Sequence, residues 1–263
     1  MRTRALPLLS LLALAACGPK ATSGSSSGSL KASVEASVDA SGVVGAKDRS
    51  EADRALDAGR KPAEFLLFLG AKPGMKAAEL FAGGGYTTEL LARAVGPEGK
   101  VYGQNSKWVL ERFAEKPWSE RLQKPVMKNV VRVDRELDDP LPPEATGLDL
   151  VVSNAIYHDT VWQKIDRTKM NAGVLRALKA GGAYVICDSS AKDGAGTTVT
   201  ETLHRIEEKI VRDDLEAAGF KLKDSSDILR NKEDTRDWSA SPGAAGEKRG
   251  TSDRFCLKFV KPS

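Results

Sequence analysis

The residues best suited to chemistry follow short apolar runs in the middle of the chain. The first group is an acid with three glycines, in Glu79-Leu-Phe-Ala-Gly-Gly-Gly-Tyr86. The second is Tyr157-His158-Asp159, which follows the apolar run 148–152. Glycines let the backbone adopt positive φ close to a ligand, and histidine is a suitable base near neutral pH. These patterns predict a ligand-binding loop and a proton-transfer group.

The glycine loop does not fit a dinucleotide. The dinucleotide fingerprint needs a further glycine three positions after its second one, and position 88 is a threonine. A carboxylate at Glu79 would also repel a pyrophosphate, whereas it could accept hydrogen bonds from an ammonium group or from N–H groups of the loop. The alternative is a packing turn that holds no ligand.

Helices and strands alternate from residue 50 onward. The apolar patterns predict strands at 75–81, 100–104, 130–133, 148–153, 183–188, 220–224 and 255–260, and helices at 51–69, 86–95, 108–122, 167–178 and 200–218. Strands separated by helices indicate a mostly parallel sheet covered on both faces, and ligands bind beyond the carboxyl ends of its strands. The last two predicted strands are joined without a helix, which favours an antiparallel hairpin at one edge.

The N-terminal residues predict an exported, lipid-anchored protein. A basic start and a short apolar stretch lead to Leu14-Ala-Ala-Cys-Gly18, which resembles a bacterial lipoprotein signal with lipidation at Cys17. We therefore expect residues 1–17 to be a signal, 18–47 a disordered Ser/Gly/Ala-rich tether, and 48–263 one domain. The expected location is the cell envelope, on the periplasmic face of the outer membrane. An ordinary secretory signal is the alternative.

Composition argues against two classes of partner. The net charge of +4 is spread along the 263 residues, so nothing in the sequence indicates nucleic-acid binding. The two histidines and the acids lie singly, without metal-ligand spacing, and no metal is expected. Cys187 and Cys256 lie in strand-like apolar runs, where buried free thiols are the expectation.

The order of these motifs resembles a class I S-adenosylmethionine-dependent methyltransferase. The resemblance rests on the glycine loop, 96–102, 148–152 and 178–185. More narrowly, the chain is similar to a family of predicted, often exported methyltransferases, through Tyr157-His-Asp, Asp166-Arg-Thr-Lys-Met-Asn171, Glu201-Thr-Leu-His-Arg205 and Ser252-Asp-Arg-Phe255. It covers about residues 50–261. It implies a doubly wound, Rossmann-like α/β fold with a seven-stranded, mostly parallel sheet of order 3-2-1-4-5-7-6. Strands five and seven are neighbours in that order, so a Cys187–Cys256 disulfide is the alternative to free thiols.

The resemblance also implies a cofactor site for S-adenosyl-L-methionine. Its expected residues lie at the carboxyl ends of the first four strands: Glu79, Phe81, Ala82, Gly83, Gly84, Gly85, Tyr86, Asn105, Asp134 and Asn154. Three positions depart from the pattern. Phe81 replaces a glycine, Asn105 replaces an acid that usually takes both ribose hydroxyls, and Ser189 replaces a histidine.

The expected catalytic residues are Tyr157, His158 and Asp159. Tyr157 and His158 would position or deprotonate the acceptor and Asp159 would orient the imidazole, although His158 could instead cap the following helix. His204 is expected to be half-buried on its helix, with a role as second base as the alternative. Three aromatic residues, Phe65, Trp108 and Trp162, would line an acceptor pocket or belong to the core.

These observations predict a lipid-anchored methyltransferase acting on a small-molecule oxygen or nitrogen in the cell envelope. A catalytically inactive binding or scaffold protein with the same fold is the main alternative, because the cofactor is made in the cytoplasm. A different reaction on this fold, such as isomerisation or hydrolysis, is the third.

Overall fold

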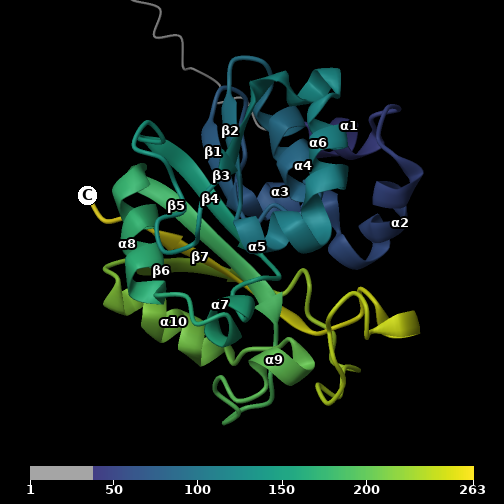
Figure 1. Cartoon of the computed structure of the whole chain (residues 1–263), viewed down its shortest axis with the longest axis vertical. Helices are drawn as coiled ribbons and strands as arrows, with labels where there is room; N and C mark the ends of the chain where they lie inside the picture. The colour runs from purple at the N-terminus through teal and green to yellow at the C-terminus, as the bar shows by residue number, and fades with distance from the viewer. Residues whose placement is uncertain (1–37) are drawn as a thin grey trace, which may run out of the picture. The chain divides into compact units, whose positions relative to one another are not determined.

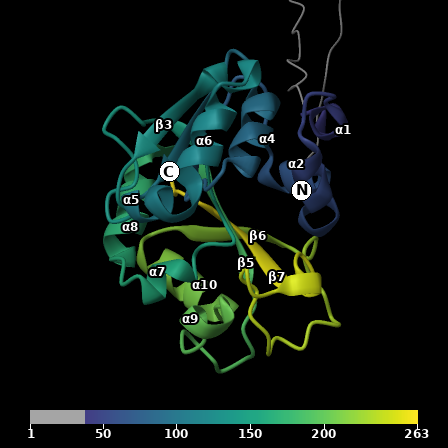
Figure 2. The same ribbon diagram turned by 45° about the vertical axis from the view of Figure 1, so that its right-hand side comes forward.

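The computed structural model describes residues 38–263, and these contain one seven-stranded sheet with helices on both faces (Figures 1 and 2). Its strand order is β3-β2-β1-β4-β5-β7-β6. The strands are β1 (Lys76–Leu80), β2 (Lys100–Asn105), β3 (Val130–Asp134), β4 (Leu148–Asn154), β5 (Leu178–Ser189), β6 (Lys221–Ser226) and β7 (Arg254–Val260). The first five are parallel, and β7 runs antiparallel between β5 and β6. The predicted fold class, strand order and terminal hairpin are confirmed.

Alternate residues of each central strand enter two separate cores. Ala77 and Val152 belong to one buried cluster, and their neighbours Ala78 and Val151 belong to the other. Strand residues that are apolar on both sides are typical of a parallel sheet buried on both faces. The central strands are thereby fixed in register, and their carboxyl ends form one edge.

Helices of the N-terminal half cover the first face, and helices of the C-terminal half cover the second. The described α-helices are α1 (Ala40–Gly45), α2 (Glu51–Arg60), α3 (Pro62–Leu69), α4 (Tyr86–Val95), α5 (Lys107–Val109), α6 (Glu115–Leu122), α7 (Asp159–Trp162), α8 (Arg167–Ala177), α9 (Thr200–Leu203) and α10 (Glu208–Ala217). A π-helical stretch, Leu110–Ala114, joins α5 to α6. None of the helices in residues 38–263 combines the length and apolar content needed to cross a membrane.

Two predicted helices are each divided by a residue in the left-handed region. The predicted helix 51–69 breaks at Lys61 (φ 43°), because Pro62 disfavours a right-handed helical conformation in the preceding residue. The predicted helix 200–218 breaks at His204 (φ 50°), which ends α9. The second break redirects the His204 side chain, with consequences for the site.

The folded part begins before residue 48. Helix α1 lies within the predicted tether, is capped by Asp39, and buries Ala40. The prediction that the tether extends to residue 47 is therefore wrong for 40–45, since these residues pack against the first core. The predicted signal, Cys17 and residues 18–37 of the tether lie outside the described residues.

Cys187 and Cys256 form a disulfide. The two residues are directly paired across β5 and β7, and both are buried. The expectation of free thiols is wrong, because strand pairing places the two side chains opposite each other on one face of the sheet.

We expect the disulfide to be detectable without reductant. The intact protein should weigh two hydrogens less than its fully reduced form, and alkylation in denaturant should modify no cysteine other than Cys17. Reduction should lower the free energy of unfolding by about 4 kcal/mol, because the bond closes a long loop. Alkylation of Cys187 and Cys256 before reduction would contradict the pairing.

Candidate functional site

The glycine loop follows β1 in a conformation that few side chains adopt. Phe81, Gly83 and Gly85 all have positive φ, of 59°, 56° and 81°. Phe81 therefore occupies the left-handed region that a glycine would favour, at a cost on the order of 1 kcal/mol. Its N–H donates to Gln104 Oε1 at 2.9 Å, which holds the loop against β2.

The loop is open at its first glycine and closed at its last. A Cβ on Gly83 would meet nothing within 4 Å, whereas one on Gly85 would lie 2.4 Å from the Trp118 ring. Arg121 Nε donates to the Gly84 carbonyl and secures the loop from α6. The open side at Gly83 leaves space for a ligand to approach the backbone.

Glu79, near the end of β1, links this strand to the helix that follows the loop. Its buried carboxylate accepts a hydrogen bond from the Thr88 hydroxyl, in the first turn of α4. Burial raises the pKa of Glu79 from 4.5 to about 7, although hydrogen bonds from Thr88 and Thr87 oppose the shift. The contact with the Thr88 hydroxyl is neither of the two expected ones, an ammonium group or N–H groups of the loop, and it joins β1 to α4.

Three other predicted cofactor residues lie in different surroundings. The Asn105 side chain is fully buried, accepts from Gly83 N at 2.8 Å and donates to Gly83 O at 3.1 Å. Asp134 is exposed and paired with Arg132 at 2.9 Å. Asn154 is half-buried, and its side-chain oxygen has no hydrogen-bond partner in the described structure. Asn105 thus binds the loop, while Asn154 keeps an acceptor free. Ala82 and Tyr86 are buried beside the glycines.

His158 is held by Asp188 at the end of the neighbouring strand. Asp188 is fully buried and accepts both from the backbone N–H of His158 and at the ring Nδ1, each at 2.8 Å. Burial lowers the pKa of His158, but the carboxylates of Asp188 and Asp159 outweigh it and raise the pKa from 6.5 to about 10. In these surroundings the imidazole donates at neutral pH, which does not support the base role expected for it.

The other ring nitrogen of His158 meets two side chains. Its Nε2 lies 3.1 Å from Asp159 Oδ1 and 3.2 Å from His204 Nδ1. Trp162 Nε1 donates to the same Asp159 oxygen at 2.8 Å. The turn after β4 brings Asp159 to the imidazole, as predicted. Helix α9 lies beside α7 (Figures 1 and 2), and its last turn ends at the left-handed His204, which is 46 residues from His158 in the sequence.

Tyr157 does not belong to this cluster. Its side chain is fully buried in the core on the second face of the sheet, where its hydroxyl donates to Asp214 at 3.2 Å and accepts from Asn171 at 3.0 Å. Adjacent residues diverge here, so the predicted catalytic role of Tyr157 is not supported. The tyrosine instead joins β4 to α8 and α10.

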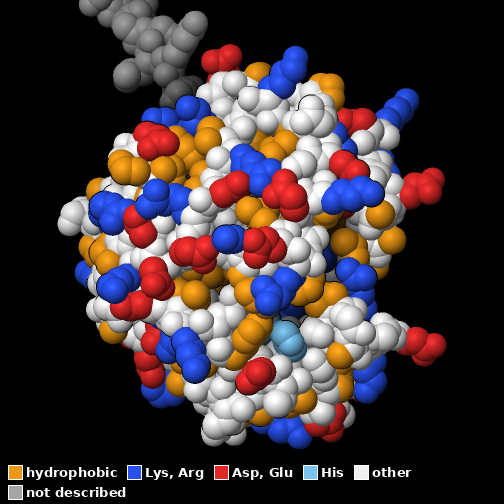
Figure 3. Space-filling view, in the orientation of Figure 1, with side chains coloured by type: hydrophobic (Ala, Val, Ile, Leu, Met, Phe, Trp, Pro, Cys, Tyr) orange, Lys and Arg blue, Asp and Glu red, His pale blue; other side chains and the backbone are white. Residues whose placement is uncertain are grey.

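Aromatic rings adjoin the histidine cluster. Trp162 packs edge-on against Trp108 at 5.5 Å between ring centroids and lies 6.4 Å from His204. Phe113, which is exposed, extends this wall at 5.3 Å from Trp108. Phe65 is buried in the core instead. Histidine atoms reach the surface on this face, where acidic and basic side chains are intermingled (Figure 3).

Two arginines to which the sequence assigned no site role are Arg60, at the end of α2, and Arg254, which belongs to the Ser252–Phe255 motif and begins β7. Arg60 stacks over the Tyr86 ring at 4.3 Å, and Arg254 donates to the carbonyl of Gly59. Neither forms an ion pair with a residue of 38–263, and Arg254 Nε is buried without a partner. Burial lowers the pKa of both, and repulsion by Arg60 further lowers that of Arg254, to about 10. The carboxylates of Asp188 and Asp253 oppose this shift for Arg254, and that of Glu79 opposes it for Arg60, so the two guanidinium charges are partly balanced within the protein.

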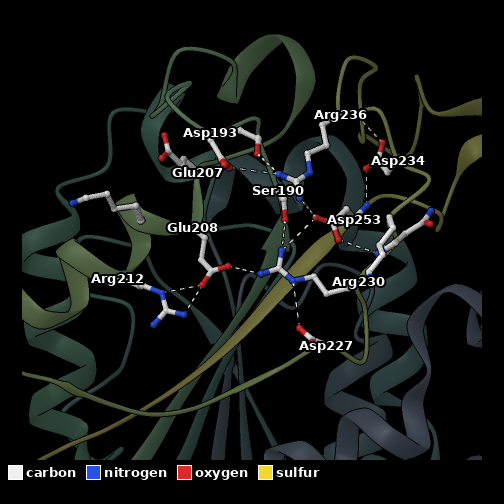
Figure 4. Close-up of a pocket in the computed structure, with 14 residues that line it drawn as sticks. Ser190, Asp193, Glu207, Glu208, Arg212, Asp227, Arg230, Asp234, Arg236 and Asp253 are labelled. Atoms are coloured by element: carbon white, nitrogen blue, oxygen red, sulfur yellow. Dashed lines mark hydrogen bonds and ion pairs between the residues drawn. The ribbon is translucent and has the colours of Figure 1, made fainter.

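A separate cavity of about 840 Å³ is lined by charges that already pair with each other (Figure 4). Arg230 contacts Glu208, Ser190 and Asp253, and Arg236 pairs with Asp253 at 2.8 Å. Below it, the fully buried Arg205 pairs with Asp234 at 2.8 Å. These contacts hold the long 227–253 segment against β5 and β7, which is a structural role.

The fold is that of known methyltransferases. The structure is similar to an S-adenosylmethionine-dependent methyltransferase from Aquifex aeolicus, with a TM-score of 0.54, 19% identity, and 84% of this chain and 98% of that chain covered. It is also similar to Aeropyrum pernix fibrillarin with natively bound S-adenosyl-L-methionine, with a TM-score of 0.50, 16% identity, and 78% of this chain and 76% of that chain covered. A third similar structure is the [4+2]-cyclase SpnF, with a TM-score of 0.53, 15% identity, and 80% of this chain and 81% of that chain covered. Comparisons with protein-family models and with curated proteins found no match. At these identities the likeness establishes the fold.

The raised pKa of Glu79 predicts a pH-dependent stability. Its folded pKa of about 7 exceeds the ordinary 4.5, so the stability it contributes is complete below about pH 4.5 and is lost as the pH rises to about 7. Glu79→Gln cannot ionise. Relative to the wild type, its free energy of unfolding should rise by up to about 3 kcal/mol across this range, measured by urea unfolding.

Glu98→Gln is the matched control, because Glu98 is exposed in a turn. It should change stability equally little at every pH. A Glu79→Gln difference that does not vary between acid and neutral pH would contradict the shifted pKa.

Proposed function

We propose that the chain is an S-adenosyl-L-methionine-dependent methyltransferase acting on a small-molecule acceptor in the cell envelope. The observation behind this proposal is the arginine pair beside the glycine loop, Arg60 and Arg254, which form no ion pair with any residue of 38–263. Arg60 stacks on the first residue of α4, and Arg254 is paired across the sheet with Ser189, at the carboxyl end of β5. An anionic group of a ligand would complete the charge balance at this edge, and the carboxylate of a methionine group would supply it.

The residues present fit the amino-acid end of such a cofactor better than its ribose. Gly83 leaves space beside the loop, and the arginine pair would hold the carboxylate. The side-chain oxygen of Asn154 is buried without a hydrogen-bond partner in residues 38–263, and it could accept from the ammonium group or a ribose hydroxyl after the side chain turns toward the ligand. Asn105 would have to release Gly83 before contacting a ribose hydroxyl, since both polar atoms of its side chain are bonded to that residue.

When bound, the cofactor supplies an electrophilic methyl group. The residues near that group are better suited to positioning the acceptor than to removing its proton as a strong base. The ring of Trp162 and its neighbour Trp108 provide an apolar wall for the acceptor, and aromatic faces attract cations such as a sulfonium. Asp159 can accept a hydrogen bond from the acceptor's hydroxyl or amine, because its pKa is held below the ordinary range: burial raises it, but hydrogen bonds from His158 and His204 prevail.

The disulfide supports the envelope location. Disulfides persist in oxidising compartments and are rare in the cytosol, and Cys187–Cys256 is buried between paired strands. Together with the predicted lipidation at Cys17, it favours a lipid-anchored protein on the periplasmic face of the outer membrane.

A binding or scaffold protein of the same fold is the second candidate. Asn105 favours this candidate, because both polar atoms of its side chain are bonded to Gly83, whereas a methyltransferase commonly uses this position to bind ribose. Purified protein incubated with labelled cofactor and envelope extracts separates the two. Label transfer that Trp162→Ala reduces supports the enzyme, while cofactor binding without transfer to any acceptor supports the scaffold.

Cofactor binding should depend on the arginine pair. In calorimetric titration, S-adenosylmethionine and S-adenosylhomocysteine should both bind, and Arg60→Met or Arg254→Met should weaken each by roughly 10- to 100-fold, because charge-assisted hydrogen bonds are lost. Without ligand, Arg60→Met should be no less stable than the wild type, since repulsion with Arg254 disappears.

Arg176→Met, at an exposed position on α8, serves as the control and should bind like the wild type. Absence of binding at roughly millimolar ligand would exclude the methyltransferase proposal. If the arginine variants bind the cofactor as tightly as the wild type, the arginines do not hold its carboxylate, but the methyltransferase proposal itself stands.

A further inference from the structure

We infer that His158, Asp159 and His204 form a binding site for a divalent metal ion of the zinc type. The three side chains come from two separate segments, the turn after β4 and the residue that ends α9. The chain has only two histidines, and both meet here. This inference does not rest on the proposed function, because the donor atoms would bind an ion in either an enzyme or a scaffold.

The spacing of the three donor atoms suits tetrahedral coordination. His158 Nε2, Asp159 Oδ1 and His204 Nδ1 are separated by 3.1, 3.2 and 3.4 Å, which is close to an equilateral triangle. Zinc bonds of 2.0–2.1 Å place neighbouring tetrahedral ligands about 3.3 Å apart. One ion just outside the plane of the triangle can therefore contact all three atoms with little movement.

Hydrogen bonds alone satisfy this triangle poorly. The single proton on His158 Nε2 can point at Asp159 or at His204, but not directly at both, because these two acceptors lie apart. The His204–Asp159 edge then needs a proton on His204 Nδ1, which would face the proton on His158. A metal ion replaces both protons and uses a lone pair from every atom.

The surroundings resemble the supporting groups of metal sites. Metal-bound histidines commonly donate their other ring nitrogen to a carboxylate, which fixes the tautomer. His158 does this toward the buried Asp188 at 2.8 Å. The ligand oxygen of Asp159 is itself held by Trp162 Nε1 at 2.8 Å. Both groups would keep lone pairs directed at the centre.

The charge of the cluster also favours a cation. Asp159 and Asp188 form no ion pair with any lysine or arginine of residues 38–263, and the basic side chains within 4 Å of them are the two histidines. A metal ion that binds His158 Nε2 displaces its proton, and the ion then faces neutral imidazoles and the two negative charges of Asp159 and Asp188. A divalent ion would neutralise them.

The donor set and exposure indicate the type of ion and its access. Two imidazoles and one carboxylate suit zinc and similar transition metals, whereas magnesium and calcium favour oxygen ligands. Side-chain exposure rises from 6% at His158 to 16% at Asp159 and 29% at His204, so the site opens outward past His204. Three protein ligands leave a position there for water or another molecule.

Titration of the purified, chelator-stripped full chain with zinc against a chromogenic chelator tests the inference. We expect one ion per chain. His204→Gly, which removes the imidazole and tolerates the left-handed backbone, should weaken binding by at least about 100-fold, as should Asp159→Asn. Asp188→Asn should weaken it by about 10- to 100-fold as a positioning residue. X-ray absorption should show two imidazole nitrogens on the bound zinc.

Asp166→Asn, an exposed acid before α8, is the control and should bind like the wild type. Zinc should raise the melting temperature of the wild type and of this control, but not of His204→Gly. Circular dichroism verifies that each variant folds. No stoichiometric zinc, equal affinity in a folded His204→Gly variant, or a bound ion without imidazole nitrogens would each overturn the inference.

Discussion

The carboxylate of Asp188 is the contact on which the rest of the site depends. Asp188 is fully buried, one residue before the end of β5. Its carboxylate accepts hydrogen bonds from the backbone N–H and the ring of His158 and from the N–H of Ser189. It thereby fixes the turn after β4 and the direction of the His158 ring. A buried carboxylate is stable only when its hydrogen bonds are made, so the turn and the strand constrain each other. The position of Asp159 then follows from the same turn.

Two of the left-handed residues in 38–263, Phe81 and His204, lie where the fold changes direction near this edge. Phe81 lets the loop leave β1 toward Gly83, and His204 ends α9 and presents its ring to His158. Non-glycine residues in this region carry a cost that the surroundings must offset, and such residues often mark functional sites. The arginine pair carries a second cost, because the two guanidinium groups repel each other and Asp188 and Asp253 offset this only in part.

The fold could be predicted from the sequence, but the composition of the site could be predicted only in part. All seven strands were predicted because apolar runs between glycine turns are local signals. The break at Lys61 had a local signal in Pro62 that was missed, whereas His204 has no proline or glycine beside it. Its contact with His158 depends on tertiary packing, as do the pairing of Cys187 with Cys256 and the approach of Arg254 to Arg60. The divergence of Tyr157 from its neighbour His158 likewise depends on a turn that spacing alone does not reveal.

We propose that the glycine loop and the arginine pair together hold the amino-acid end of an adenosyl cofactor. A crystal structure of the protein grown with S-adenosylhomocysteine tests this most directly. We expect ligand density beside Gly83, with the carboxylate against Arg60 and Arg254. Density at another edge of the sheet, or a carboxylate remote from both arginines, would contradict it.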